Sequence, residues 1–141
     1  AALAVKRHPL DCDLTRWRAE TLRLATIHGV ADRVAFLDCG DVRAVTERAA
    51  GMVTVKSTAG FSALCAGLPV KALGRAAWGI EGLADTRPLA AFLAGPKPPE
   101  PGLAEAFARV LAATVQIPGA FDGPGAEAAA ERVALAILAR P

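Results

Sequence analysis

Short apolar runs alternate with stretches of helical periodicity over residues 1–74, and this alternation constrains the fold more than any other feature. The runs are too short for helices, and residues 51–56 are rich in β-branched residues, so the runs predict strands. A β-α-β-α-β-α-β order is typical of an α/β fold, in which helices flank a parallel sheet, here of about four strands. The predicted strands are residues 1–6, 33–37, 51–56 and 69–73, and the predicted helices between them are residues 14–28 (capped by Asp13), 42–49 and 58–66.

The pattern changes after Gly74. Residues 75–99 predict a loop region with Trp78 and Leu83 as apolar anchors and one or two helical turns. Residues 100–141 predict two longer helices, separated by a Pro-Gly break. A chain of 141 residues has the usual size of one domain, so we expect a single domain over its whole length.

Charge and composition disfavour several classes of protein. The formal net charge is only +2, so nucleic-acid binding lacks its usual electrostatic support, and we expect no nucleic-acid partner. The longest uncharged run, residues 57–70, is shorter than a membrane span, and the first residues contain no charged leader. Three cysteines, Cys12, Cys39 and Cys65, form no CxxC pair, which favours a reduced, cytoplasmic protein.

We expect neither a metal nor a cofactor. The sequence has no GxGxxG or GxxxxGK[ST] motif, which disfavours dinucleotide-binding folds and P-loop nucleotidases. A zinc site formed by His8, Cys12 and Cys39 would have a spacing that matches no usual ligand pattern.

The carboxyl ends of the predicted strands are the expected place for a ligand, because parallel strands end at one edge of the sheet. Four segments follow these ends: His8-Pro9, Asp38-Cys39-Gly40, Ser57-Thr58-Ala59-Gly60 and Gly74-Arg75. Their expected convergence is stronger evidence for a binding site than any one segment.

Ser57 and Thr58 stand where the third strand turns into a helix, and there the free N–H groups and the helix dipole favour an anion. The two hydroxyls add donors, Gly60 permits close approach, and Lys56 adds charge. The alternative interpretation is that a hydroxyl only caps the helix.

His8 ends the first strand beside Lys6, and a histidine there could donate a hydrogen bond to a phosphate or a departing phosphate ester. The simpler interpretation is a solvated or backbone-bonded histidine. Asp38 or Asp41 could bind a ribose, although capping of the second helix is the better explanation. No acid–base pair of carboxylates is evident.

These residues resemble one family, the bacterial capsule polysaccharide biosynthesis and export proteins. The His-Pro and Ser-Thr pairs are weak motifs alone, and a similar combination occurs in the CMP-binding half of bacterial sialyltransferases. The resemblance is specific because several blocks keep the family's order from about residue 4 to residue 122. These blocks are residues 5–9, 51–64, 67–70, 73–76, 82–83 and 116–121.

The resemblance implies a cytosolic glycosyltransferase that adds β-linked Kdo from CMP-Kdo to a lipid anchor. It implies that His8 and the Ser57-Thr58 pair hold the CMP phosphate and its leaving group, with His8 as the catalytic residue. The substrate-binding residues that it implies are Lys6, His8, Pro9, Ser57, Thr58, Gly60, Gly74 and Gln116. Departures from the family's usual residues are Arg7, Lys56, Trp78, Glu81 and Val115.

The resemblance also implies a Rossmann-like domain that forms the C-terminal half of a two-domain, GT-B-type enzyme. We expect the chain to begin inside the second strand of that half, so that the acceptor domain and the catalytic carboxylates lie on sequence outside it. Such a fragment would bind the donor without turnover. In the intact half, a central strand would lie between residues 1–6 and 51–56; without it, we expect these two strands to pair directly, because free strand edges invite pairing. The alternative is that another copy of the chain fills the gap.

Two other functions stay open: a non-catalytic Rossmann-like module that assists capsule polysaccharide export, and a transferase that uses another sugar nucleotide. The expected partners are CMP-Kdo, or a related sugar nucleotide, and a lipid-linked saccharide acceptor bound through the absent domain. The expected location is the cytoplasm, with the inner face of the inner membrane as the alternative if the full-length protein associates peripherally.

Overall fold

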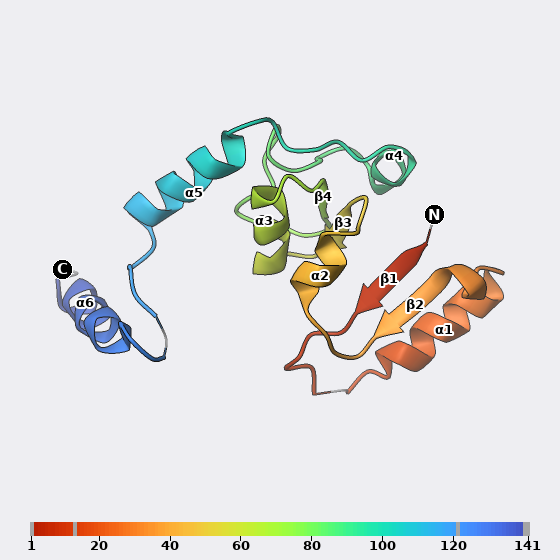
Figure 1. Cartoon of the computed structure of the whole chain (residues 1–141), viewed down its shortest axis with the longest axis horizontal. Coiled ribbons are helices and arrows are strands. Elements are labelled where there is room, and N and C mark those ends of the chain that lie inside the picture. Colours follow the sequence, from red (N-terminus) through yellow and green to blue (C-terminus); the bar gives the residue numbers. More distant parts are fainter. Residues whose placement is uncertain (1, 13, 121, 140–141) are drawn as a thin grey trace. The chain divides into compact units, whose positions relative to one another are not determined.

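The computed structural model describes residues 2–12, 14–120 and 122–139, and the chain divides into two compact units (Figure 1). Unit 1 comprises residues 1–49 and unit 2 comprises residues 50–141. Each unit contains a parallel pair of strands with helices, so the predicted α/β class is confirmed.

Unit 1 is one β-α-β connection followed by a short helix. Its elements are β1 (Leu3–Lys6), α1 (Trp17–Ile27), the 3-10 helix η1 (Ala31–Arg33), β2 (Val34–Leu37) and α2 (Val42–Thr46). Strands β1 and β2 are parallel, with Val5 opposite Phe36, and a parallel pair needs a crossover of the kind that α1 supplies. Helix α1 packs on β2, where Phe36 is buried beneath the Arg18 guanidinium, 5.9 Å from the ring centre.

The start of α1 differs from the prediction. The helix begins at Trp17, after Arg16, whose side chain makes no capping hydrogen bond. The predicted cap, Asp13, lies outside the described residues.

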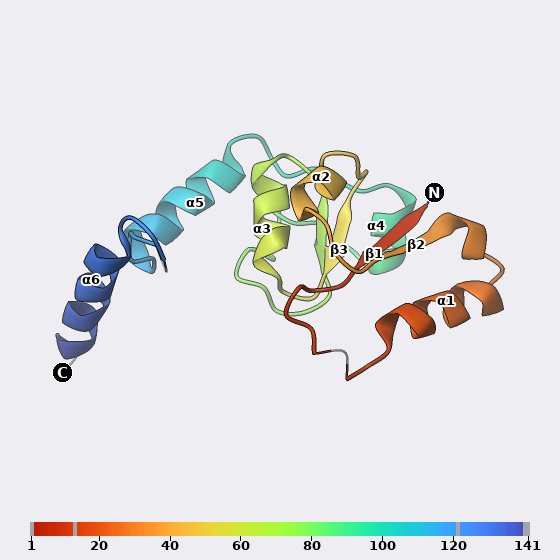
Figure 2. The ribbon, with the colours of Figure 1, turned by 60° about the horizontal axis from the view of Figure 1, so that its bottom comes forward.

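Unit 2 contains the second β-α-β connection and all the later helices. Its elements are β3 (Met52–Thr54), α3 (Thr58–Cys65), β4 (Val70–Ala72), α4 (Leu89–Ala94), α5 (Leu103–Thr114) and α6 (Ala126–Leu138). Strands β3 and β4 are parallel, with Met52 opposite Val70, and α3 packs against both of them (Figure 2).

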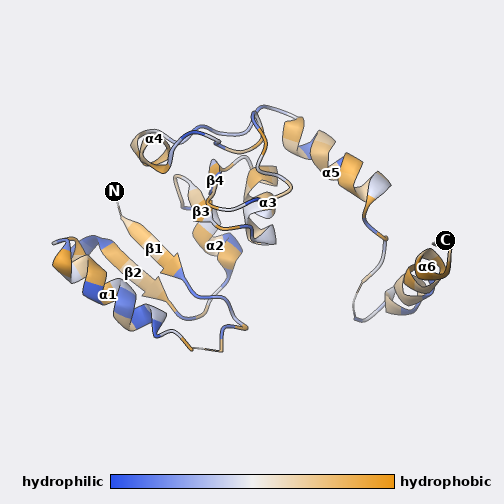
Figure 3. Cartoon of the chain, turned by 180° about the vertical axis from the view of Figure 1, so that it is seen from behind, coloured by the Kyte–Doolittle hydropathy of each residue, from blue (hydrophilic) through white to orange (hydrophobic). Residues whose placement is uncertain are grey.

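The main core of unit 2 lies between α3, β4 and the loop that follows β4. Leu64, Val70 and Leu83 are almost completely buried, and Trp78 is 5% exposed, so the predicted loop anchors Trp78 and Leu83 are confirmed. Helix α5 joins this core through an edge-to-face contact between Phe61 and Phe107, whose ring centres are 5.5 Å apart. Hydrophobic residues are prominent along both α5 and α6 (Figure 3).

The predicted pairing of the strands is wrong. The strands form two separate two-stranded sheets, β1 with β2 and β3 with β4, and no ladder joins β1 to β3 in the part of the chain that the structure describes. One β-α-β connection joins β1 to β2 and another joins β3 to β4, and each connection brings only its own two strands together. Strands β1 and β3 belong to different units and no single crossover links them, so nothing local in the sequence favours their pairing.

No helix in residues 2–12, 14–120 and 122–139 combines the length and the hydropathy that a membrane-spanning helix needs.

Candidate functional site

The start of α3 lies directly beyond the carboxyl end of β3. Ser57 is the N-cap residue, with extended backbone angles, and its Oγ accepts a hydrogen bond of 3.2 Å from the Ala59 N–H. The capping interpretation of the Ser-Thr pair is therefore confirmed for Ser57. A hydroxyl is both acceptor and donor, so the Ser57 O–H can still donate to a ligand.

Thr58 is the first residue of α3 and is exposed. Its hydroxyl makes no hydrogen bond within the described residues, whereas its carbonyl oxygen accepts one from the Ser62 hydroxyl. Within the described residues both hydroxyls of the pair therefore keep a free donor, at the end of the helix where the dipole is positive.

Gly60 is buried one turn into α3, where it meets the Trp78 indole. A Cβ at this position would lie 2.6 Å from Cζ2 of Trp78, which is closer than any packed side chain tolerates. From the sequence, Gly60 is predicted to permit the close approach of a ligand. In the structure its missing side chain makes room for Trp78.

Gly74 follows β4 and lies beside the end of β3. Its N–H donates a 3.0 Å hydrogen bond to the Val55 carbonyl, which extends the ladder by one residue pair beyond the strands. The structure therefore brings Gly74 and the start of α3 to the same edge of unit 2. Lys56 and Arg75 flank this edge, both are exposed, and neither has an ion-pair partner among the described residues.

We define the α3 edge as Lys56, Ser57, Thr58, Gly74 and Arg75. It combines two side-chain hydroxyls, two cations and the positive end of a helix dipole, with no carboxylate among its members. Its chemistry suits an oxyanion, such as a phosphate.

His8 lies just beyond the end of β1 in unit 1. The neighbouring Arg7 N–H donates to the Leu37 carbonyl at 3.0 Å, which continues the β1–β2 ladder. The Nδ1 atom of His8 accepts a 3.1 Å hydrogen bond from the Leu10 N–H, so in the neutral ring the proton resides on Nε2. His8 is backbone-bonded, as its simpler interpretation predicts, and it is also exposed with a donor available.

The remaining candidates of unit 1 have structural partners. Asp38 lies between two arginines, 3.0 Å from Arg18 Nη1 and 4.0 Å from Arg7 Nε. Asp41 caps α2 by accepting a 2.9 Å bond from the Arg43 N–H, so the capping interpretation is confirmed for Asp41.

Three further predicted site residues are Lys6, Pro9 and Gln116. The Lys6 ammonium donates to the Arg7 carbonyl at 3.2 Å, and Pro9 is exposed. Gln116 follows α5 in unit 2, where its N–H donates to the Leu111 carbonyl at 3.0 Å and its exposed side chain has no partner among the described residues. The convergence of His8 with the α3 edge stays a prediction.

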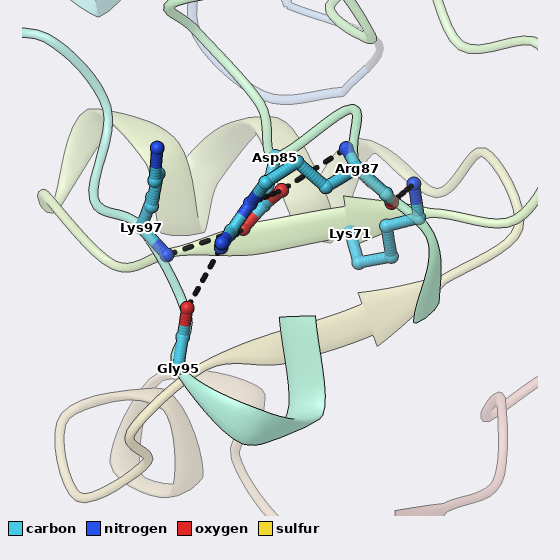
Figure 4. A network of polar contacts seen from close by, with 5 residues as sticks. All are labelled: Lys71, Asp85, Arg87, Gly95 and Lys97. Atoms are coloured by element: carbon cyan, nitrogen blue, oxygen red, sulfur yellow. Dashed lines mark hydrogen bonds and ion pairs between the residues drawn. The ribbon is translucent and has the colours of Figure 1, made fainter. Parts of the chain in front are cut away.

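A buried charge network that the sequence patterns do not predict lies in the loop after β4 (Figure 4). The Asp85 side chain is only 1% exposed, and it accepts hydrogen bonds from Arg87 Nε at 2.9 Å and Arg87 Nη2 at 2.5 Å. Two backbone N–H groups, of Arg87 and Lys97, also donate to it. Arg87 reaches the Gly95 carbonyl at 2.7 Å, and Lys71 donates to the Arg87 carbonyl.

The charge of Asp85 is strongly stabilised by these contacts. The Arg87 guanidinium holds the pKa of the Asp85 carboxyl far below its usual range, against the opposing effect of burial. The signal in the sequence is a carboxylate and a guanidinium two residues apart, Asp85 and Arg87, within a loop that otherwise buries apolar residues.

Comparisons with known proteins point to one family. The family model "Capsule polysaccharide biosynthesis protein" matches residues 1–121. Two proteins called "Capsule polysaccharide modification protein LipB", from Neisseria meningitidis serogroups A and B, are 32% identical over 120 residues, covering 84% of this chain and 29% of the relative. "Capsule polysaccharide export protein KpsS" of Escherichia coli is 33% identical over 81 residues, covering 57% of this chain and 21% of the relative.

The chain thus spans less than a third of the length of these curated relatives. No solved structure matches it significantly.

Proposed function

The chain belongs to the capsule polysaccharide biosynthesis protein family, and from this premise we propose that it binds the sugar-nucleotide donor of a capsule glycosyltransferase. The proposed donor is CMP-Kdo, and the proposed reaction of the complete enzyme transfers Kdo to a lipid-linked saccharide. In this proposal the chain is part of the Rossmann-like, C-terminal half of a GT-B-type enzyme that works in the cytoplasm.

The α3 edge is the observation that carries this proposal. A sugar nucleotide presents a phosphate, and the α3 edge offers the Ser57 and Thr58 hydroxyls and two cations. Within the described residues the Thr58 hydroxyl makes no hydrogen bond and neither cation has an ion-pair partner. Charge-assisted hydrogen bonds of this kind are roughly twice as strong as neutral ones. They would hold the phosphate while leaving the sugar free to face an acceptor.

The proposed chemical step breaks the bond between the anomeric carbon of the sugar and a phosphate oxygen, and forms a bond from that carbon to a hydroxyl oxygen of the acceptor. The acceptor hydroxyl loses its proton to a base that we expect among the catalytic carboxylates on sequence outside these residues. The electron pair of that bond passes to the phosphate, so negative charge grows on CMP as it leaves. Donors that are already aimed at this charge stabilise the transition state more than the ground state. We assign this role to the Nε2–H of His8, together with Thr58.

A second candidate is a module that assists export without chemistry, which the description of KpsS as an export protein favours. Calorimetry on this chain separates the two functions. A donor-binding chain gives saturable heat with CMP at millimolar concentration or below, and a weaker response with UMP if the donor is a CMP-sugar. Absence of heat with both nucleotides supports the export module, and a stronger response with UMP indicates a UDP-sugar donor.

The role of His8 is tested in a complete transferase that contains this chain. Removal of a donor to a developing charge lowers kcat by about 100-fold, so we expect that loss for His8→Ala. His28→Ala is the matched control, because His28 is the exposed residue that ends α1. Unchanged turnover of the folded His8→Ala enzyme would exclude the assignment.

A further inference from the structure

A small pocket lies beside β4 in unit 2, on the side of the loop that carries Asp85. Its volume is about 190 Å³, which corresponds to roughly six water molecules at about 30 Å³ each. Drug-sized ligands occupy about 300 Å³ or more, so this pocket suits a single sugar ring or a smaller group better than a whole nucleotide. Its polar residues are Lys71, Asp85 and Thr86, and small residues that line it include Ala72, Gly74 and Ala84.

Asp85 is not available to a ligand, although it lines the pocket. A carboxylate has about four lone-pair positions, and Asp85 already accepts four hydrogen bonds, three from Arg87 and one from the Lys97 N–H. Its negative charge is also neutralised by the Arg87 guanidinium. Asp85 therefore leaves little attraction for a cation or for a ligand hydroxyl.

Lys71 is the other charged residue that lines the pocket. Its ammonium donates to a neutral acceptor, the Arg87 carbonyl, and it has no ion-pair partner in the described parts of the chain (Figure 4). An ammonium has three donors, so two are left. The Thr86 hydroxyl is a further donor, exposed and without a hydrogen-bond partner among residues 2–12, 14–120 and 122–139.

We propose that this pocket binds the oxyanion of a small ligand through Lys71 and Thr86, and that this oxyanion is the carboxylate of an acidic sugar. The assignment to a sugar rests on the proposed function, which brings an acidic sugar to unit 2. Gly74 belongs to both the pocket and the α3 edge, so a phosphate at that edge and a carboxylate in the pocket would occupy neighbouring places. The walls of small residues leave room for a ring.

The test is a titration of the isotope-labelled chain followed by amide chemical shifts, with free Kdo, mannose and inorganic phosphate as separate probes. We expect Kdo to cause saturable shifts at Lys71 and Thr86, and mannose, which is neutral, to cause none. Equal responses to mannose and Kdo would overturn the charge-based proposal. Binding of phosphate without binding of Kdo would overturn the assignment to a sugar carboxylate.

Two lysine variants test the contact itself. Lys71→Met removes the ammonium but keeps an apolar stem, and we expect it to weaken Kdo binding by roughly tenfold or more, as for a lost charged hydrogen bond. Lys97→Met is the matched control, because the side chain of Lys97 is exposed and only its backbone N–H enters the network. An unchanged Kdo affinity in Lys71→Met would overturn the proposal.

A CMP titration of the same variant separates this inference from the proposed function. CMP shifts at Ala59 and Gly60 that persist in Lys71→Met show that the chain is folded and that the α3 edge works. A chain that binds CMP but not Kdo contradicts the pocket assignment alone. A chain that binds Kdo at Lys71 but not CMP supports the pocket and contradicts the nucleotide function.

Discussion

Asp85 is the buried charged residue of the part of the chain that the structure describes. Its carboxylate is buried and receives four hydrogen bonds that tie the loop around residues 85–97 together. Asp85→Asn removes the charge and places an amide N–H₂ against the Arg87 guanidinium. Because breaking a buried pair leaves the other charge uncompensated, we expect the free energy of unfolding to fall by about 3 kcal/mol in urea denaturation.

The matched control for this variant is Glu81→Gln in the same loop. Glu81 is exposed and has no partner among the described residues, so its loss is expected to change stability by less than about 0.5 kcal/mol. Equal effects of the two substitutions would mean that the Asp85 network is not a stabilising feature.

The stability of the protein also depends on pH through Asp85. Hydrogen bonds from Arg87 lower the pKa of the folded-state carboxyl below its unfolded value of about 3.9. A depressed pKa gives stability that is complete above the unfolded pKa and is lost as the pH falls toward the folded one. We therefore expect the stability difference between the wild type and Asp85→Asn to be constant above about pH 5 and to shrink below about pH 4.

Unfolding curves from pH 7 to pH 3 check this prediction. A difference that stays constant over the whole range would show that the Asp85 pKa is not lowered by folding.

At the scale of single elements, α3 depends on the contact between Gly60 and Trp78. Helix propensity alone favours alanine over glycine by about 1 kcal/mol. A Cβ at position 60 would nevertheless lie 2.6 Å from the buried indole, and overpacking costs about 1–3 kcal/mol. We expect Gly60→Ala to be destabilising and to change the near-ultraviolet circular dichroism of Trp78.

Gly95→Ala is the control for that substitution. Gly95 has an extended backbone, and a Cβ there meets no atom within 4 Å, so stability should be unchanged or slightly higher. A Gly60→Ala protein as stable as Gly95→Ala would refute the packing role of Gly60.

The elements themselves were predictable from local patterns. The observed elements lie within the predicted segments or within a few residues of them. This holds for the four strands, for α1, α2 and α3 in residues 1–74, and for the later helices. The ends of the elements were less predictable, because they depend on specific contacts. Helix α1 begins at Trp17 and not at residue 14, and strand β3 covers Met52–Thr54 and not residues 51–56. The capping roles of Ser57 and Asp41 follow from their positions before helices.

Long-range features were not predictable in the same way. The Asp85–Arg87 network lies in an aperiodic loop, and its partners at Lys71 and Lys97 are distant in sequence. The pairing of strands across the two β-α-β connections also depends on contacts that no local pattern encodes. For the same reason the predicted role of Gly60 differed from the observed one, since its neighbour Trp78 belongs to a later loop.

At the scale of the whole chain, the buried apolar residues are unevenly divided. In the described part of unit 1 only Ala25 and Phe36 are buried hydrophobic residues, whereas unit 2 contains the cluster around Leu64, Val70 and Leu83. Regions with few buried contacts open more readily. We expect amides of the β3–β4 ladder to exchange with solvent roughly tenfold more slowly than those of the β1–β2 ladder, or slower still.

Hydrogen exchange under native conditions measures this difference. Equal protection in both ladders would mean that the two units open together as one cooperative domain.

A CMP titration of three proteins tests the proposal that the α3 edge binds a nucleotide phosphate. Thr58→Val keeps the side-chain shape but removes a hydroxyl that has no hydrogen-bond partner among the described residues. Ser62→Ala removes the next exposed hydroxyl of α3, which donates to the Thr58 carbonyl within the helix. We expect saturable CMP binding to the wild type and Ser62→Ala, with amide shifts at Ala59 and Gly74, and an affinity about tenfold lower in Thr58→Val. Equal affinities of all three proteins, or CMP shifts that spare the α3 edge, would contradict it.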